Sequence, residues 1–248
     1  MVVYSVFVGI LGLVIGSFLN VVIWRVPNGE SIVKPGSHCP KCGHFLKAWE
    51  LVPVLSYIIL KGKCHNCGSK ISLRYPAVEM LTGILYFFTA YTAKNFGVWE
   101  LGLNLTFISL LIVLAFIDLD SYRLPDVLVL PAFVVGILKS FVIGDPEIWR
   151  SLVGALITSG IFYLIAIFYS QGMGMGDVKF VAALGAFLGF PDILLAVFLA
   201  SLIGVVAVGL MLIFTKKGFR DPIPFGPFLV MGTLLIFFLK DWLLSFVM

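Results

Sequence analysis

The chain has 248 residues, of which 60% are hydrophobic and only 12% charged, and its mean hydropathy is +1.10. This composition is far more apolar than the core of a soluble domain requires, so it excludes an ordinary soluble protein and predicts a polytopic protein of the lipid bilayer. The net charge of +4 is attributed to membrane topology, and no nucleic-acid partner is expected.

The apolar segments recur along the whole chain, and about 20 such residues cross a bilayer as a helix. We predict an all-α polytopic membrane protein with about eight transmembrane helices, over residues 2–23, 76–93, 100–117, 127–143, 150–169, 178–190, 192–214 and 227–247. The span 178–190 is short, so we expect it to tilt or to line a wet cavity.

Three local patterns add detail to the predicted set of transmembrane helices. The first span lacks a basic N-terminal region and an Ala-x-Ala-like cleavage site, so we expect it to stay as an anchor. The apolar run 51–60 is too short to cross the bilayer and is expected to be interfacial or buried. Gly12–Gly16 and Gly185–Gly189 have GxxxG spacing, which predicts close helix packing.

The basic residues predict the orientation, because cytoplasmic loops carry an excess of Lys and Arg. With the N-terminus outside, 13 of the 17 basic residues fall inside: Arg25, Lys34, Lys41, Lys47, Lys61, Lys63, Lys70, Arg74, Arg123, Lys179, Lys216, Lys217 and Arg220. The other four, Lys94, Lys139, Arg150 and Lys240, fall outside or near outer helix ends. This bias places the N-terminus outside and the long polar loop 24–75 in the cytoplasm.

The loop 24–75 contains all four cysteines, in two CxxCG units. Each unit sets two thiolates on one side of a tight turn, and the glycine that follows can adopt a positive φ. Two such turns complete a tetrahedron, although the 21 residues between the pairs slightly exceed the usual zinc-ribbon gap of about 15 to 20. The pattern predicts a structural Zn²⁺ site with the ligands Cys39, Cys42, Cys64 and Cys67.

Other interpretations of the cysteines are weaker. A pair of disulfides is disfavoured by the reducing cytoplasm, and a thioredoxin-like redox site would need a βαβ pattern that the sequence lacks. His38, His44 and His65 could replace a thiolate, but four cysteines are sufficient. A four-ligand site has no open position for a reacting water, so we expect the zinc to fold the loop and not to catalyse.

Two aspartates are candidates for chemistry, because carboxylates at the edge of a bilayer are costly. Asp118 falls at the inner end of the third span and Asp177 at the inner start of the sixth, so topology puts both at one membrane face. Taken singly, each has an ordinary explanation: Asp177 as a helix N-cap, and Asp118, with Asp120 and Asp126, as a solvated loop acid.

The context of Asp177 favours a peptide substrate. Gly172, Gly174 and Gly176 precede it and let the backbone approach another chain closely. Two facing carboxylates would share a proton, so that one activates water while the other polarises a carbonyl. Lys179 is expected on another helix face, where it would snorkel to the interface or balance the local charge.

The chain resembles the type IV prepilin peptidases, bifunctional leader peptidases and N-methyltransferases of the GxGD aspartyl membrane protease group. The resemblance covers almost the whole chain, through both CxxC pairs and through residues 16–27, 74–79, 118–126, 174–179 and 223–228. These segments read GSFLNVVIWRVP, RYPAVE, DLDSYRLPD, GMGDVK and IPFGPF. Several motifs in the family's order are far more specific than any one of them.

The resemblance implies cleavage of a short basic leader from prepilin or pseudopilin proteins, then methylation of the new N-terminus with S-adenosylmethionine. It implies location in the bacterial inner membrane, with the active site on the cytoplasmic side. The catalytic aspartates map onto Asp118 and Asp177, with Asp120 and Asp126 as secondary candidates. Gly174, Gly176 and Lys179 belong to the same motif, and the methyltransferase maps to the loop and its flanks, with Glu50, Lys63 and Glu79.

The sequence thus predicts three parts: a first helix over 1–23, a tetracysteine domain over 24–75 associated with methyl transfer, and a peptidase domain over 76–248. Two rival functions stay open from the residues alone. A proton- or cation-coupled transporter would also use membrane aspartates, although no internal repeat is evident. A non-enzymatic assembly factor would use the zinc loop for docking.

Overall fold

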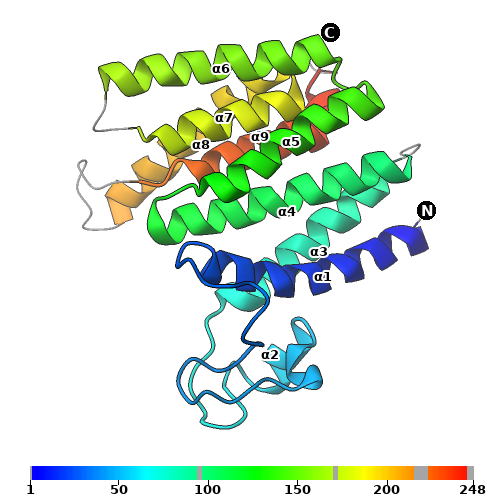
Figure 1. The fold of residues 1–248 in the computed structure, drawn as a ribbon, viewed down its shortest axis with the longest axis vertical. Coiled ribbons are helices and arrows are strands. Elements are labelled where there is room, and N and C mark those ends of the chain that lie inside the picture. Colours follow the sequence, from blue (N-terminus) through cyan, green and yellow to red (C-terminus); the bar gives the residue numbers. More distant parts are fainter. Residues whose placement is uncertain (1, 94–96, 170–172, 215–222, 245–248) are drawn as a thin grey trace. The chain divides into compact units, whose positions relative to one another are not determined.

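The computed structural model describes residues 2–93, 97–169, 173–214 and 223–244. Within these residues it is all-helical, as predicted, with two isolated β-bridges and no strand. The helices are α1 (Val2–Arg25), η1 (Ala48–Leu51), α2 (Leu55–Ile59), α3 (Arg74–Thr92), α4 (Val98–Ser121), α5 (Asp126–Ile143), α6 (Ile148–Phe168), α7 (Met175–Leu188), α8 (Asp192–Phe214) and α9 (Gly226–Leu244) (Figure 1).

Every predicted span coincides with a helix. Five of these helices, α1, α4, α5, α6 and α8, are long and apolar enough to cross a membrane by length and composition, and α9 contains a shorter apolar stretch. The count of about eight spans therefore stays a prediction. The short span is confirmed as a short helix, because α7 has 14 residues and reaches only about 21 Å at 1.5 Å per residue.

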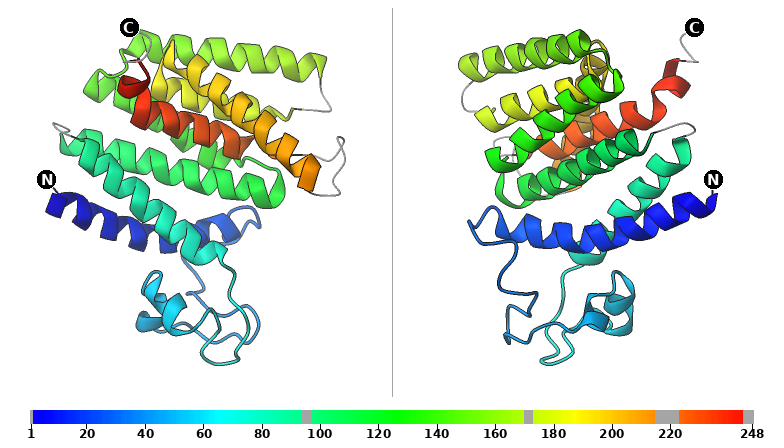
Figure 2. Two further views of the ribbon diagram at one scale, coloured as in Figure 1. Left: turned by 180° about the vertical axis from the view of Figure 1, so that it is seen from behind. Right: turned by 45° about the vertical axis from the view of Figure 1, so that its right-hand side comes forward.

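The chain divides into two compact units, residues 1–97 and 98–248. In the first unit α1 and α3 lie side by side (Figure 2). A Cβ on Gly12 would lie 2.7 Å from the Cβ of Tyr86, and one on Gly16 would lie 2.7 Å from the Cα of Glu79. The GxxxG spacing of α1 therefore marks close helix packing, as predicted.

Between α1 and α3 the chain forms the polar loop, with only η1 and α2 as helices. The apolar run 51–60 contains α2, whose Leu55, Ile58 and Ile59 are exposed. The expectation that this run might be buried is wrong, because a five-residue helix held beside a polar loop covers little apolar surface. The exposed side chains fit the interfacial alternative.

In the second unit α7 packs against α5, α6 and α9 (Figure 1). Its Phe180, Val181 and Leu184 are fully buried, and the ring of Phe187 stacks on that of Phe107 at a centroid distance of 3.6 Å. Gly185 lies against α6, where a Cβ would meet the carbonyl of Gly154 at 2.7 Å. This close packing allows a short, apolar helix to occupy the core of the unit.

The contact between α1 and α3 is testable at Gly12. The variant Gly12→Leu should lower the free energy of unfolding by about 1–3 kcal/mol, because the added side chain overlaps Tyr86 and the backbone of Gly83. The loss of stability would be measured as a drop in the apparent melting temperature in detergent. The matched control is Gly160→Leu on α6, where a Cβ meets nothing within 4 Å. Equal effects of the two variants would contradict the assigned packing.

Candidate functional site

Asp118 is a buried carboxylate near the end of α4, with 5% of its surface exposed. Its Oδ2 accepts a hydrogen bond of 2.8 Å from the backbone N–H of Gly226, the first residue of α9. The first N–H groups of a helix have no partner within the helix, and they favour negative charge. The expectation that Asp118 could be a solvated loop acid is wrong, because it is helical and buried.

Asp177 lies in the first turn of α7 and is half-buried. The N-cap of this helix is Gly174, so the alternative that Asp177 is itself the N-cap is wrong. The Oδ2 of Asp177 instead accepts a hydrogen bond of 3.3 Å from the Gly174 N–H. Gly176 packs against the loop before α5, where its Cβ would lie 3.2 Å from that of Leu124. Gly172 lies outside the described residues.

The fold brings the two aspartates into one unit, and their carboxylates lie close enough for their charges to interact. Each carboxylate is held by a backbone N–H at the start of a helix. Neither forms an ion pair with a cation in the described part of the chain. The pair is therefore a candidate for acid–base work on a bound peptide.

The secondary candidates occupy different positions. Asp120 is exposed near the end of α4, and so is not the loop acid that one alternative supposed. Asp126 begins α5, is exposed, and pairs with Lys179 of α7 at 2.7 Å and 2.9 Å. This ion pair joins the start of α5 to the start of α7. Lys179, the basic residue nearest to Asp177 in the sequence, is therefore paired with Asp126.

Gly226 contacts Asp118 but is not among the site residues predicted from the sequence, because it has no ionisable side chain. A Cβ at this position would lie 2.7 Å from the Oδ2 of Asp118, so any side chain here would displace the carboxylate. The signal was present in the sequence as Gly-Pro, which is typical of a helix start. The contact itself spans 108 positions of the chain and is set by the packing of α4 against α9.

The four cysteines form one cluster in the loop. Their Sγ atoms all lie within 4.8 Å of one another, with 3.9 Å between those of Cys39 and Cys67 and 4.0 Å between those of Cys42 and Cys64. A Zn–S bond of about 2.3 Å gives a tetrahedral edge of about 3.8 Å, which these separations match. All four thiols are free, so the disulfide alternative is wrong for this structure.

The two CxxCG turns have matching backbone geometry. Gly43 and Gly68 have φ of +71° and +69°, as predicted, and their N–H groups donate to the carbonyls of Cys39 and Cys64 at 2.9 Å. The N–H groups of Cys42 and Lys41 lower the pKa of the Cys39 thiol to about 6. Backbone donors thus favour the thiolate, which is the form that binds a metal.

The three histidines beside the cysteines do not belong to this cluster. The Nε2 of His44 contacts the Oε2 of Glu50 at 3.2 Å, while His38 contacts the carbonyl of Gly36 and His65 packs edge-on against Trp49. Glu50 is buried, and its Oε2 also accepts a hydrogen bond of 2.7 Å from the Lys47 N–H, which lowers the pKa of this carboxyl.

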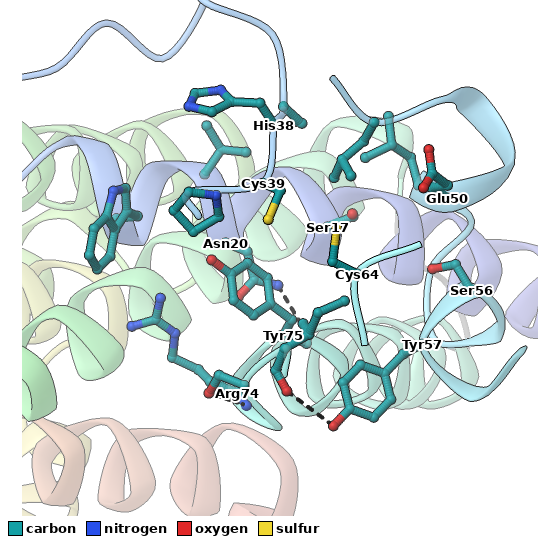
Figure 3. Close-up of a pocket in the computed structure, with 18 of the residues that line it drawn as sticks. Ser17, Asn20, His38, Cys39, Glu50, Ser56, Tyr57, Cys64, Arg74 and Tyr75 are labelled. Atoms are coloured by element: carbon teal, nitrogen blue, oxygen red, sulfur yellow. Dashed lines mark hydrogen bonds between the residues drawn. The ribbon is translucent and has the colours of Figure 1, made fainter. Parts of the chain in front are cut away.

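A pocket of about 640 Å³ lies in the first unit, between the loop and the ends of α1 and α3 (Figure 3). Glu79 of α3 lines it and accepts a hydrogen bond of 2.7 Å from the Val54 N–H. Glu79 therefore belongs to this pocket in the first unit, whereas the two aspartates belong to the second. Cys39 and Cys64 also face the pocket, so the cysteine cluster forms part of its wall.

Comparisons with known proteins cover both units. The bacterial peptidase A24 N-terminal domain matches residues 10–93, and the type IV leader peptidase family matches residues 105–210. No solved structure matches the chain.

Similar curated proteins carry the name prepilin leader peptidase/N-methyltransferase. One from Myxococcus xanthus (strain DK1622) is 42% identical over 220 residues, which cover 86% of this chain and 65% of that protein. One from Neisseria gonorrhoeae is 37% identical, with 94% of this chain and 89% of that protein covered. One from Pseudomonas aeruginosa is 36% identical, with 90% and 86% covered.

Proposed function

The chain belongs to the type IV leader peptidase family, and from that membership we propose that it cleaves the leaders of prepilin-like proteins and methylates the new N-terminus. The pair formed by the buried Asp118 and the half-buried Asp177 is the observation that carries the peptidase assignment. The matches give no support to the transporter alternative.

Asp118 and Asp177 act together on the scissile peptide bond. One carboxylate is ionised and takes a proton from an attacking water, while its protonated partner donates a hydrogen bond to the carbonyl oxygen. The tetrahedral intermediate then collapses as the leaving amine gains a proton, and no covalent acyl-enzyme forms. Two interacting carboxylates that form no ion pair with a cation among the described residues favour this single shared proton.

The surroundings of the pair suit an extended peptide. Gly174 is exposed and leaves room for a substrate backbone beside Asp177. Gly176 packs against Leu124, and the ion pair between Asp126 and Lys179 also fixes the start of α7. The apolar helices of the unit would accept the hydrophobic N-terminal segment of a prepilin or pseudopilin from the bilayer.

The protein is placed in the bacterial inner membrane with several spans. The excess of basic residues in the loop and in the turns on the same side supports an outer N-terminus and a cytoplasmic active site. Lys216, Lys217 and Arg220 contribute to that excess but lie outside the described residues, as does Lys94 on the outer side of the count.

The cysteine cluster is proposed to hold Zn²⁺. Cys39, Cys42, Cys64 and Cys67 supply four sulfur ligands at separations that fit a tetrahedron, and backbone N–H groups favour the ionised form of Cys39. Four ligands leave no open position, so the metal folds the loop. Closed, tetrahedral coordination by four cysteines is typical of structural zinc sites.

The methyltransferase is assigned to the first unit, residues 1–97. The division predicted from the sequence, into residues 1–23, 24–75 and 76–248, instead grouped residues 76–97 with the peptidase. When bound, S-adenosylmethionine supplies a methyl group: the amine nitrogen bonds the methyl carbon, the C–S bond breaks with its electron pair left on sulfur, and the product ammonium loses a proton. The loop and the ends of α1 and α3 hold the pocket that suits this ligand.

The variants Asp118→Asn and Asp177→Asn should each lower the rate of leader cleavage by at least about 100-fold, because each removes one partner of the acid–base pair. The rate of leader cleavage would be measured by mass spectrometry of the N-terminus of a prepilin that is co-purified in detergent. Asp120→Asn should keep most of the activity, since Asp120 is exposed, and Asp145→Asn serves as a distant carboxylate control. Cleavage at the wild-type rate by either of the first two variants would contradict the assignment of the aspartate pair.

The variant Gly226→Ala should lower the cleavage rate by about 10- to 100-fold with little change in melting temperature. The new methyl group displaces the flexible carboxylate of Asp118 and removes its hydrogen bond, while the helices keep their packing. Gly160→Ala, which meets nothing within 4 Å, is the control. Unchanged cleavage by Gly226→Ala would contradict the assigned position of Asp118.

Metal analysis of the protein purified in detergent should give about one zinc per chain. The double variant Cys39→Ser with Cys64→Ser should lose the metal and lower the yield, because the loop loses its fold. His38→Ala should keep the metal, since His38 is beside the cluster but not within it. Wild-type protein that contains no zinc would contradict the site.

A further inference from the structure

The short helix α2 has an apolar face that the described part of the chain leaves exposed. Leu55, Ile58 and Ile59 are 58%, 63% and 69% exposed, and their i, i+3 and i+4 spacing puts them on one side of the helix. Val52, just before the helix, is also exposed. Exposed apolar side chains that gather at one place mark an interaction surface.

The opposite side of α2 is fixed to the rest of the first unit. The hydroxyl of Tyr57 donates a hydrogen bond of 3.3 Å to the carbonyl of Ile71, and Ser56 and Tyr57 line the pocket (Figure 3). The N–H of Val54, the N-cap of α2, donates to the Oε2 of Glu79 on α3 at 2.7 Å. These contacts hold α2 in one orientation, so the fold itself presents the apolar face outward.

The position of α2 along α1 places this face beside the bilayer. Glu79, which accepts the hydrogen bond from α2, packs against Gly16 of α1, where a Cβ would lie 2.7 Å from the Cα of Glu79. Gly16 precedes Arg25, the last residue of α1, by nine residues, or about 13 Å at 1.5 Å per residue. Within this unit, α2 accordingly lies alongside α1 and not beyond its end (Figures 1 and 2).

The surface of α1 changes its character at the same position. From Ser17 to Arg25, polar side chains of α1 line the pocket of the loop, including that of Asn20. Before Gly16, every exposed side chain of α1 is apolar or aromatic, and α1 is long and apolar enough to cross a membrane. The boundary between lipid and the polar loop therefore falls near Gly16, which is where α2 begins.

The exposed charge around α2 is almost entirely positive. Six lysines of the loop 24–75 are exposed, three on each side of the apolar run 51–60 in the sequence: Lys34, Lys41, Lys47, Lys61, Lys63 and Lys70. Arg74 is half-buried at the start of α3, and Arg25 is buried and donates to the carbonyls of the loop. The loop has only two acids, of which Glu30 is exposed and Glu50 is buried against His44. An anionic lipid surface complements this charge.

A protein partner fits this face less well than lipid does. Stable protein interfaces use about 20 to 30 residues on each side, whereas the apolar face of α2 consists of a few side chains on a helix of five residues. Contact with a lipid leaflet has no such minimum size, because the membrane-spanning helices already hold the chain in the bilayer. Lysines beside the face can also lie along the lipid with their amines among the headgroups.

We propose that α2 is an interfacial lipid anchor, with Leu55, Ile58 and Ile59 inserted at the boundary between headgroups and acyl chains of the cytoplasmic leaflet. Lys47 and Lys61, on either side of the apolar run, select anionic headgroups. The anchor holds the tetracysteine loop against the membrane, and it goes beyond the proposed peptidase and methyltransferase activities.

Photocrosslinking of the full-length protein tests the lipid contact. The variant Ile59→p-benzoylphenylalanine is reconstituted into vesicles of phosphatidylethanolamine and phosphatidylglycerol in equal parts, irradiated, and analysed by mass spectrometry. Its yield of lipid adducts should match that at Leu156, an exposed residue of α6, and exceed that at Lys34 by about tenfold or more. Lys34 is the control because Arg25 binds the carbonyl of Pro35 and keeps this exposed segment at the cytoplasmic end of α1.

Two outcomes of this experiment would overturn the anchor. One is a yield of lipid adducts at Ile59 no higher than at Lys34, and the other is crosslinking of Ile59 to a second copy or to another segment of the chain. Ile58 provides a second position for the same measurement. Both leaflets of the vesicles have the same composition, so the result depends neither on the orientation of the chain nor on the proposed cleavage and methylation.

The role of the lysines is tested by the composition of the adducts. Phosphatidylglycerol should be enriched about twofold or more at Ile59 relative to Leu156, because exposed lysines attract anionic headgroups. The double variant Lys47→Gln with Lys61→Gln should lose most of this enrichment while lipid adducts persist, whereas Lys34→Gln should keep it. Equal composition at the two positions, or enrichment unchanged in the double variant, would contradict the selection of anionic lipid.

Discussion

Both aspartates of the site are held by backbone N–H groups at the start of a helix. Asp118 accepts from Gly226 at the start of α9, and Asp177 accepts from Gly174 at the start of α7. Helix starts carry unsatisfied donors and a partial positive charge, so they stabilise a carboxylate without a cation. This matters because a paired lysine or arginine would hold both carboxylates ionised, whereas the proposed chemistry needs one of them protonated.

Glycines allow this arrangement by letting helices and loops approach closely. Gly226 leaves space for the Asp118 carboxylate, Gly176 brings the start of α7 against the loop before α5, and Gly185 seats α7 against α6. The same property joins α1 to α3 through Gly12 and Gly16 in the first unit. Substitution at these positions therefore acts on the position of a functional group as much as on stability.

The sequence was sufficient for features that depend on local chemistry. Apolar length located all the long helices, and the CxxCG spacing predicted a four-thiolate cluster with positive φ at Gly43 and Gly68. It could not separate Asp118 from Asp120 without the family resemblance, because two residues at the same helix end differ only in which one packs inward. Contacts across long separations, such as that of Asp118 with Gly226, depend on tertiary packing and have no local signal.

The cysteine cluster and the pocket of the first unit are physically linked. Cys39 and Cys64 are buried and face the pocket, whereas Cys42 and Cys67 are exposed. A metal that binds all four thiolates would fix both CxxCG turns and so set the pocket wall they share with Asn20 and Glu50. The loop is too polar to bury enough apolar surface to order itself. A structural metal therefore offers a physical reason why cysteines that take no part in catalysis lie beside a methyl-donor site.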